Sequence, residues 1–153
     1  MKEIRLDAYH GEYLQRLYPN CRLVFLIRNP YSAFKSYIAR AGWYERFPDR
    51  PVFDAQSFAR QWRRVTESFL ERGPAIGAFT LTFEEMTSNP EVLARLSAHT
   101  GTVVDASVLQ VKRRGEESAI PAEIHPKEMR VLVNELGELA SSLGYATPDL
   151  PTR

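Results

Sequence analysis

Residues 23–30 read LVFLIRNP, and this stretch decides the fold that the sequence predicts. Five consecutive apolar and mostly branched residues, 23–27, are typical of a strand that is buried on both faces of a parallel sheet. The strand ends at the guanidinium of Arg28. Asn29 is then a suitable N-cap, and Pro30 suits the first position of a helix. A strand, a cation and a helix N-terminus in this order predict an anion site at the carboxyl end of a sheet.

The helix expected over residues 31–40 carries Ser32, Ser36 and Arg40 along one stripe, because they recur at every fourth position. Arg28 could donate two parallel hydrogen bonds to a phosphate, and Ser36 could add a hydroxyl donor from the side. The alternative is an arginine paired with a carboxylate beside solvated serines. Spacing alone leaves both interpretations open.

The rest of the chain alternates between patterns typical of strands and of helices, which predicts the α/β class. The helix expected near the N-terminus should turn Tyr13, Leu14 and Leu17 inward. Further strands are predicted over 3–6 and 78–82, and further helices over 9–18, 55–72, from 89 to about 101, and 126–143.

Composition narrows the function classes. The chain has 153 residues, 44% of them hydrophobic, and a net charge of +1, so no single-sign field points to nucleic acid or membrane partners. The lone Cys21 suits a reducing, cytoplasmic location. The cysteine and histidine spacings do not predict a metal site. Of the histidines, His10 is the candidate catalytic base, because it follows the first predicted strand at its carboxyl end.

The predicted strand with Arg28-Asn29-Pro30 and Ser36 resembles the 3′-phosphate-binding segment of sulfotransferases that use 3′-phosphoadenosine 5′-phosphosulfate. Other stretches agree with that family in the expected order, over about residues 2–115. They are KEIRL at 2–6, YPNCR at 18–22, the segment 58–62, and LTFEEM at 81–86 followed by Asn-Pro at 89–90.

The resemblance implies a partial P-loop NTPase-like fold, with a three-layer arrangement of a parallel sheet flanked by helices. It implies a single domain over residues 1–153 that is incomplete at its N-terminus, with residues 116–153 forming a C-terminal helix and tail that pack on it. Members of the family hold the 5′-phosphosulfate with a Lys/Arg-Ser-Gly-Thr/Ser loop. The sequence contains neither this loop nor a GxxxxGK[ST] motif.

The resemblance also implies a set of cofactor-binding residues. Phe83 stands where the family carries a tyrosine near the nucleotide, so one hydroxyl contact is missing. The basic segment 113–115 resembles the one that closes over the 3′-phosphate, although a basic cluster in a loop can also be solvated charge alone. The implied set is Arg28, Ser36, Phe83, Arg113, Arg114 and Gly115.

Two interpretations of function follow. The first is transfer of a sulfuryl group from the nucleotide cosubstrate to a hydroxyl or amine of a small-molecule or glycan acceptor, without a metal. The second is a truncated, non-catalytic remnant that binds the nucleotide or a protein partner. In either case an unpaired edge beside the central strand would expose apolar surface, which predicts self-association into a homo-oligomer.

Overall fold

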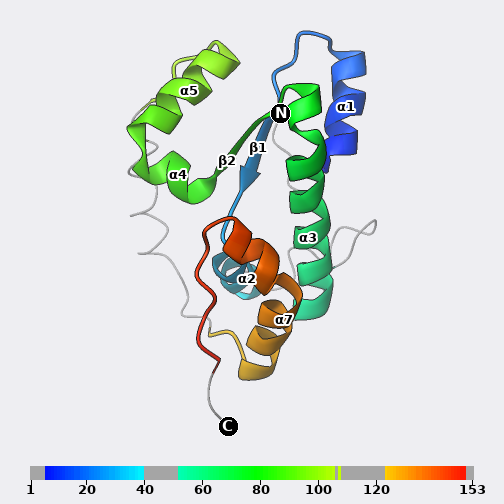
Figure 1. The fold of residues 1–153 in the computed structure, drawn as a ribbon, viewed down its shortest axis with the longest axis vertical. Coiled ribbons are helices and arrows are strands. Elements are labelled where there is room, and N and C mark those ends of the chain that lie inside the picture. Colours follow the sequence, from blue (N-terminus) through cyan, green and yellow to red (C-terminus); the bar gives the residue numbers. More distant parts are fainter. Residues whose placement is uncertain (1–5, 40–51, 106, 108–122, 151–153) are drawn as a thin grey trace. The chain divides into compact units, whose positions relative to one another are not determined.

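The structure is a computed structural model that describes residues 6–39, 52–105, 107 and 123–150 (Figure 1). The chain divides into two compact units. The first contains residues 1–28 and 64–117, and the second contains residues 29–63 and 118–153. One long helix, α3 (Ala55–Arg72), contributes residues to both units.

A pair of parallel strands forms the centre of the first unit, so the α/β class is confirmed. Strand β1 (Val24–Ile27) pairs with β2 (Phe79–Thr82), in a register that aligns Val24 with Phe79 and Ile27 with Thr82. Within the described residues, the sheet consists of these two strands. The unit's other elements are α1 (Ala8–Leu17), the 3-10 helix η2 (Pro74–Ile76), α4 (Phe83–Ser88) and α5 (Pro90–Thr100).

Strand β1 is buried on one face only, so the prediction of burial on both faces is wrong. Phe25 and Ile27 are buried, whereas Val24 and Leu26 are 39% and 45% exposed. Leu81 of β2 is aligned with the exposed Leu26 but is itself covered, because it packs against Val92 and Leu96 of α5. The same covering does not reach the neighbouring strand.

The inward face of α1 also differs from the prediction. Tyr13 and Leu17 are 61% and 52% exposed. The helix instead approaches the strand through Gly11, where a Cβ atom would lie 3.1 Å from Leu23 Cδ1 and 3.3 Å from Phe25 Cζ. A larger side chain would hold the helix away, so small size rather than hydrophobicity selects the contact face.

The second unit is a helical cluster built from α2 (Pro30–Ile38), the first half of α3 and α7 (Pro126–Ser142). Phe34 of α2 and Leu132 and Leu136 of α7 are completely buried. The ring centroid of Phe34 lies 5.1 Å from that of Phe58.

The predicted helix ends agree well with the structure. Asn29 caps α2 and Pro30 is its first residue, as the sequence predicts. Gly101 follows α5 at φ = +69°, a left-handed conformation that favours glycine. The strand predicted over 3–6 falls on residues 3–5, which lie outside the described residues, and on Leu6, which is not in a strand. Of the helices in the described part of the chain, none has the length and hydrophobicity to cross a membrane.

Candidate functional site

Two of the predicted cofactor-binding residues meet where β1 and β2 end. Arg28 follows β1 directly and Phe83 follows β2, and the parallel register brings these two ends to the same edge of the sheet. The guanidinium carbon of Arg28 lies over the Phe83 ring, 5.3 Å from its centroid. Arg28 is exposed and Phe83 is half-buried. Stacking on the ring orients the guanidinium.

The start of α4 explains how Phe83 is held. Thr82 and Glu85 form a capping box, in which the Glu85 amide donates to the Thr82 hydroxyl at 3.1 Å. The Thr82 amide donates in return to the Glu85 carboxylate at 2.9 Å. Phe83 is the first residue of this helix, so the cap fixes the backbone that carries the ring. Glu85 therefore has a structural role at the strand end.

The side chain of Asn29 occupies backbone amides at the start of α2 that were expected to bind an anion. Its side-chain oxygen accepts hydrogen bonds from the amides of Tyr31 and Ser32, at 3.0 and 3.1 Å. These amides already have acceptors within the chain, so an anion here would depend on side-chain donors. Ser36 lies on α2 and is half-buried. It belongs to the second unit and Arg28 to the first, so their joint use stays a prediction. Arg113, Arg114 and Gly115 lie outside the described residues.

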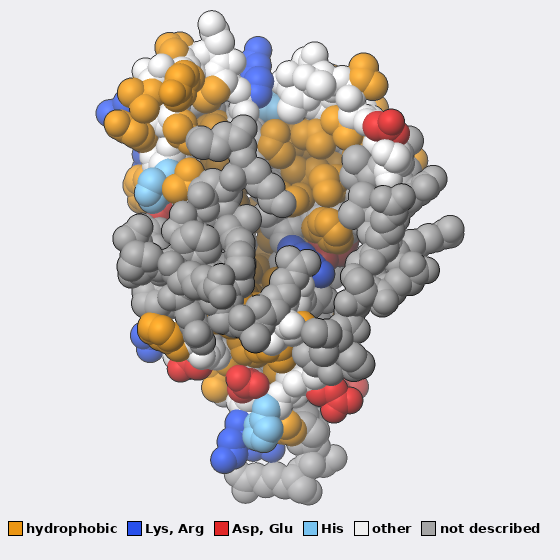
Figure 2. All heavy atoms as spheres, turned by 180° about the vertical axis from the view of Figure 1, so that it is seen from behind, with side chains coloured by type: hydrophobic (Ala, Val, Ile, Leu, Met, Phe, Trp, Pro, Cys, Tyr) orange, Lys and Arg blue, Asp and Glu red, His pale blue; other side chains and the backbone are white. Residues whose placement is uncertain are grey.

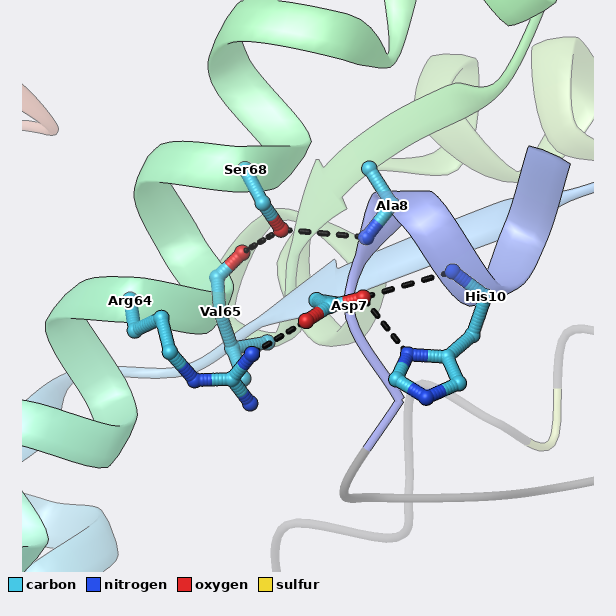
Figure 3. A network of polar contacts seen from close by, with 6 residues as sticks. All are labelled: Asp7, Ala8, His10, Arg64, Val65 and Ser68. Carbon is cyan, nitrogen blue, oxygen red and sulfur yellow. Dashed lines mark hydrogen bonds and ion pairs between the residues drawn. The ribbon is translucent and has the colours of Figure 1, made fainter.

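His10, the candidate base, belongs to a polar network at the start of α1 (Figure 3). Its ring Nδ1 lies 2.6 Å from Oδ1 of Asp7, and Asp7 is only 5% exposed. The other carboxylate oxygen of Asp7 accepts a hydrogen bond from Arg64 of α3. Beside this pair, the amide of Ala8 donates to the hydroxyl of Ser68 at 3.0 Å. Helices α1 and α3 are therefore joined by two polar contacts, one through the Asp7 carboxylate and one through the Ser68 hydroxyl.

The charge on Asp7 is stabilised by this network. Burial alone would raise the pKa of Asp7, but hydrogen bonds from the His10 ring and amide and from Arg64 outweigh it and lower the pKa. Asp7 is also the N-cap of α1, since its side chain accepts from the His10 amide. The carboxylate is ionised at neutral pH and acts only as an acceptor.

Replacing Asp7 with asparagine should reduce the acid sensitivity of folding. A carboxyl whose pKa is lowered by folding stabilises the native state above its unfolded value of about 3.9, and this stabilisation is lost as the pH falls through the folded value. We expect the free energy of unfolding of the wild type to decrease below about pH 4 more steeply than that of Asp7→Asn. Urea unfolding at a series of pH values between about 5 and 2 measures this.

The exposed Asp149 provides the matched control, because Asp149→Asn makes the same change of charge away from a buried network. Its pH curve should follow that of the wild type. Parallel curves for the wild type and Asp7→Asn would contradict the lowered pKa of Asp7.

One comparison with known proteins identifies the family of the chain. A family model described as Sulfotransferase family matches residues 7–105, about two thirds of the 153-residue chain. The chain belongs to the sulfotransferase family. The match covers α1, both strands, α4 and α5, and therefore both Arg28 and the network at Asp7. Searches of the curated proteins and of the solved structures gave no match.

The sequence alone did not identify Asp7 and Arg64 as members of the charged network at His10. Asp7 precedes His10 by three positions, the spacing of a helix N-cap and its third residue, and this signal was available. The pairing of Asp7 with Arg64 spans 57 positions and had no local signal. Among the described residues, no group of three or more metal-ligating side chains could hold a metal ion.

Proposed function

We propose that this member of the sulfotransferase family binds 3′-phosphoadenosine 5′-phosphosulfate through its 3′-phosphate and transfers the sulfuryl group to a hydroxyl or amine acceptor. The acceptor is a small molecule or a glycan. The proposal includes a single domain of the P-loop-like, three-layer type and a cytoplasmic location. It takes Arg28 and Phe83 as nucleotide-binding residues, and adds Ser36, Arg113, Arg114 and Gly115 from the sequence resemblance.

The observation that carries the proposal is the position of Arg28. Arg28 is an exposed residue at the carboxyl ends of two parallel strands, and the Phe83 ring orients its guanidinium. Ligands of open α/β sheets bind at this edge. An oriented guanidinium donates paired hydrogen bonds to a phosphate, and an aromatic ring offers an apolar face to a nucleobase. Membership of the sulfotransferase family supports this class of ligand.

Replacing Arg28 with alanine should weaken binding of 3′-phosphoadenosine 5′-phosphate by about 10- to 150-fold. A hydrogen bond to a charged group contributes about 1.5–3 kcal/mol, and removing the guanidinium also removes its charge. Isothermal titration of the wild type and Arg28→Ala with this nucleotide measures the difference. A parallel titration with adenosine 5′-phosphate, which lacks the 3′-phosphate, should show little difference between the two proteins.

Arg22→Ala is the matched control, because Arg22 is equally an exposed arginine but precedes β1 and so stands at its amino end. This variant should bind the nucleotide like the wild type. Equal affinities of wild type and Arg28→Ala would contradict the proposed phosphate site, and equal losses in both variants would indicate a general charge effect.

A second candidate function is a protein-interaction module, and an apolar surface favours it. Tyr9, Tyr13 and Leu17 recur at every fourth position of α1 and are each more than half exposed, as is Tyr18. Figure 2 shows hydrophobic side chains gathered over α1, at the upper left of the view. Self-association through this surface is part of this second proposal.

Light scattering tests self-association, and a monomer at every concentration would contradict it. Nucleotide binding without sulfation would favour the non-catalytic role.

A further inference from the structure

Asp7 is the N-cap of α1, and His10 belongs to the first turn of this helix. The amide of Gln15, near the end of α1, donates to the carbonyl of Ile76, which lies just before β2 begins. Helix α1 therefore runs opposite to the strands, and its first turn points toward their carboxyl ends (Figures 1 and 3). This is the edge at which Arg28 stands.

The hydrogen bond between Asp7 and His10 determines which ring nitrogen carries the proton. An ionised carboxylate can only accept, so Nδ1 of a neutral His10 must be the donor at 2.6 Å. The lone pair of the neutral ring is then on Nε2. The side chain of His10 is 42% exposed, and among the described residues no hydrogen bond engages Nε2. The available lone pair therefore belongs to the nitrogen that the carboxylate does not bind.

The polar network at the start of α1 contains contacts that a helix cap does not require. Asp54 and Ser57 show the simple form at the start of α3, where an exposed carboxylate accepts from the Ser57 amide at 2.7 Å and from its hydroxyl at 2.6 Å. At α1 the carboxylate is buried, and its second oxygen is bound to Arg64 from another helix. Arg64 thus fixes the carboxylate, and the carboxylate fixes the imidazole.

We infer that His10 Nε2 accepts the proton of the acceptor group during sulfuryl transfer, and that Asp7, held by Arg64, is the positioning residue for its ring. The inference rests on the proposed function. The O–H or N–H bond of the acceptor breaks and its proton moves to Nε2, while the acceptor atom forms a bond to sulfur. The bond from sulfur to the bridging phosphate oxygen breaks, and its electron pair leaves with 3′-phosphoadenosine 5′-phosphate.

The first test needs no turnover. Two-bond 15N–1H spectra of histidine-labelled protein, recorded at a pH of about 8.5 where imidazole side chains are neutral, report the tautomer of each ring. His10 is assigned by the signal that disappears in His10→Ala. We expect Nδ1 of His10 to be protonated in the wild type and the Nε2-protonated form to increase in Asp7→Asn, because an amide can donate to Nδ1. A wild-type ring that is protonated on Nε2 would overturn the inference.

The second test measures sulfation with the nucleotide donor and a panel of phenol, alcohol and amine acceptors. His10→Ala should lower kcat by about 100- to 10,000-fold, the usual contribution of a general base, and Asp7→Asn should lower it by about 10-fold or more. The nucleotide Kd should stay within about twofold of the wild type in both variants. Added imidazole should restore part of the activity of His10→Ala, an effect that a purely structural role would not produce.

Asp54→Asn is the matched control, since Asp54 caps its helix through the third residue without an imidazole, and it should leave kcat unchanged. Unchanged kcat in His10→Ala would overturn the inference while leaving the nucleotide site intact. Wild-type protein that binds the nucleotide but sulfates no acceptor would also overturn it. Absence of nucleotide binding would instead refute the proposed function, and the spectra would still show whether Asp7 positions the ring.

Discussion

Phe25→Ala should lower the free energy of unfolding by about 3–5 kcal/mol. Phe25 is 6% exposed, and its ring is stacked on that of Phe69 of α3, with centroids 4.0 Å apart and planes inclined by 13°. Gly11 of α1 and Gly73 also approach the ring, since a Cβ atom on either would lie within 3.4 Å of it. Truncation leaves a cavity that a strand and two helices border, and a backbone this constrained can close it only partly. Urea unfolding followed by circular dichroism measures the loss.

Val24→Ala is the control for this prediction, because Val24 is the adjacent residue of β1 but 39% exposed. Its loss should be below about 1 kcal/mol, as is usual for partly exposed positions. Losses of the same size in the two variants would show that both faces of β1 are buried, against the arrangement in the structure.

Phe34→Ala should have a comparable effect in the second unit, again about 3–5 kcal/mol. Phe34 is completely buried, and its ring centroid lies 5.1 Å from that of Phe58 and 5.9 Å from that of Tyr37. Its removal therefore takes away burial together with two aromatic contacts. Phe53→Ala removes the same side chain from a position that is 68% exposed, and should change stability by less than about 1 kcal/mol. A small effect of Phe34→Ala would contradict its place at the centre of the helical cluster.

The local signals in the sequence predicted the element boundaries well. Asn29 and Pro30 begin α2, Gly101 ends α5, and the helix predicted over 55–72 has these bounds in the structure. These features depend on residues within a few positions of each other, through side-chain caps and the conformational freedom of glycine. The pattern of one sequence contains that information directly.

The errors concern contacts between distant segments. The apolar run at 23–27 predicted a strand buried on two faces, but α5 covers Leu81 of β2 and leaves Leu26 exposed. Likewise the hydrophobic pattern of α1 favoured Tyr13 and Leu17 as core residues, whereas the helix packs through Gly11. Which face is covered depends on the partner that arrives, and local periodicity does not specify the partner.

For the candidate site, the residue types were predictable and their arrangement was not. The order of strand, Arg28 and helix start predicted a cation at the sheet edge, and the structure places Arg28 there over Phe83. The surroundings of His10 were not predicted, because Arg64 reaches Asp7 from a helix far along the chain. A pair of opposite charges separated by 57 positions is one of many such pairs in a sequence with 20 basic and 19 acidic residues.

The parallel register of the two strands has a consequence for the order of events during synthesis. Val24 pairs with Phe79, 55 positions later, and the contact of Arg28 with Phe83 spans the same interval. Closing a loop of that length costs about 3.6 kcal/mol of chain entropy, which the contacts made after closure must offset. Neither β1 nor the arginine beside it can therefore reach its final environment until the ribosome has released the chain as far as Phe83. A nascent chain that stops short of this point would carry the guanidinium without the ring that orients it.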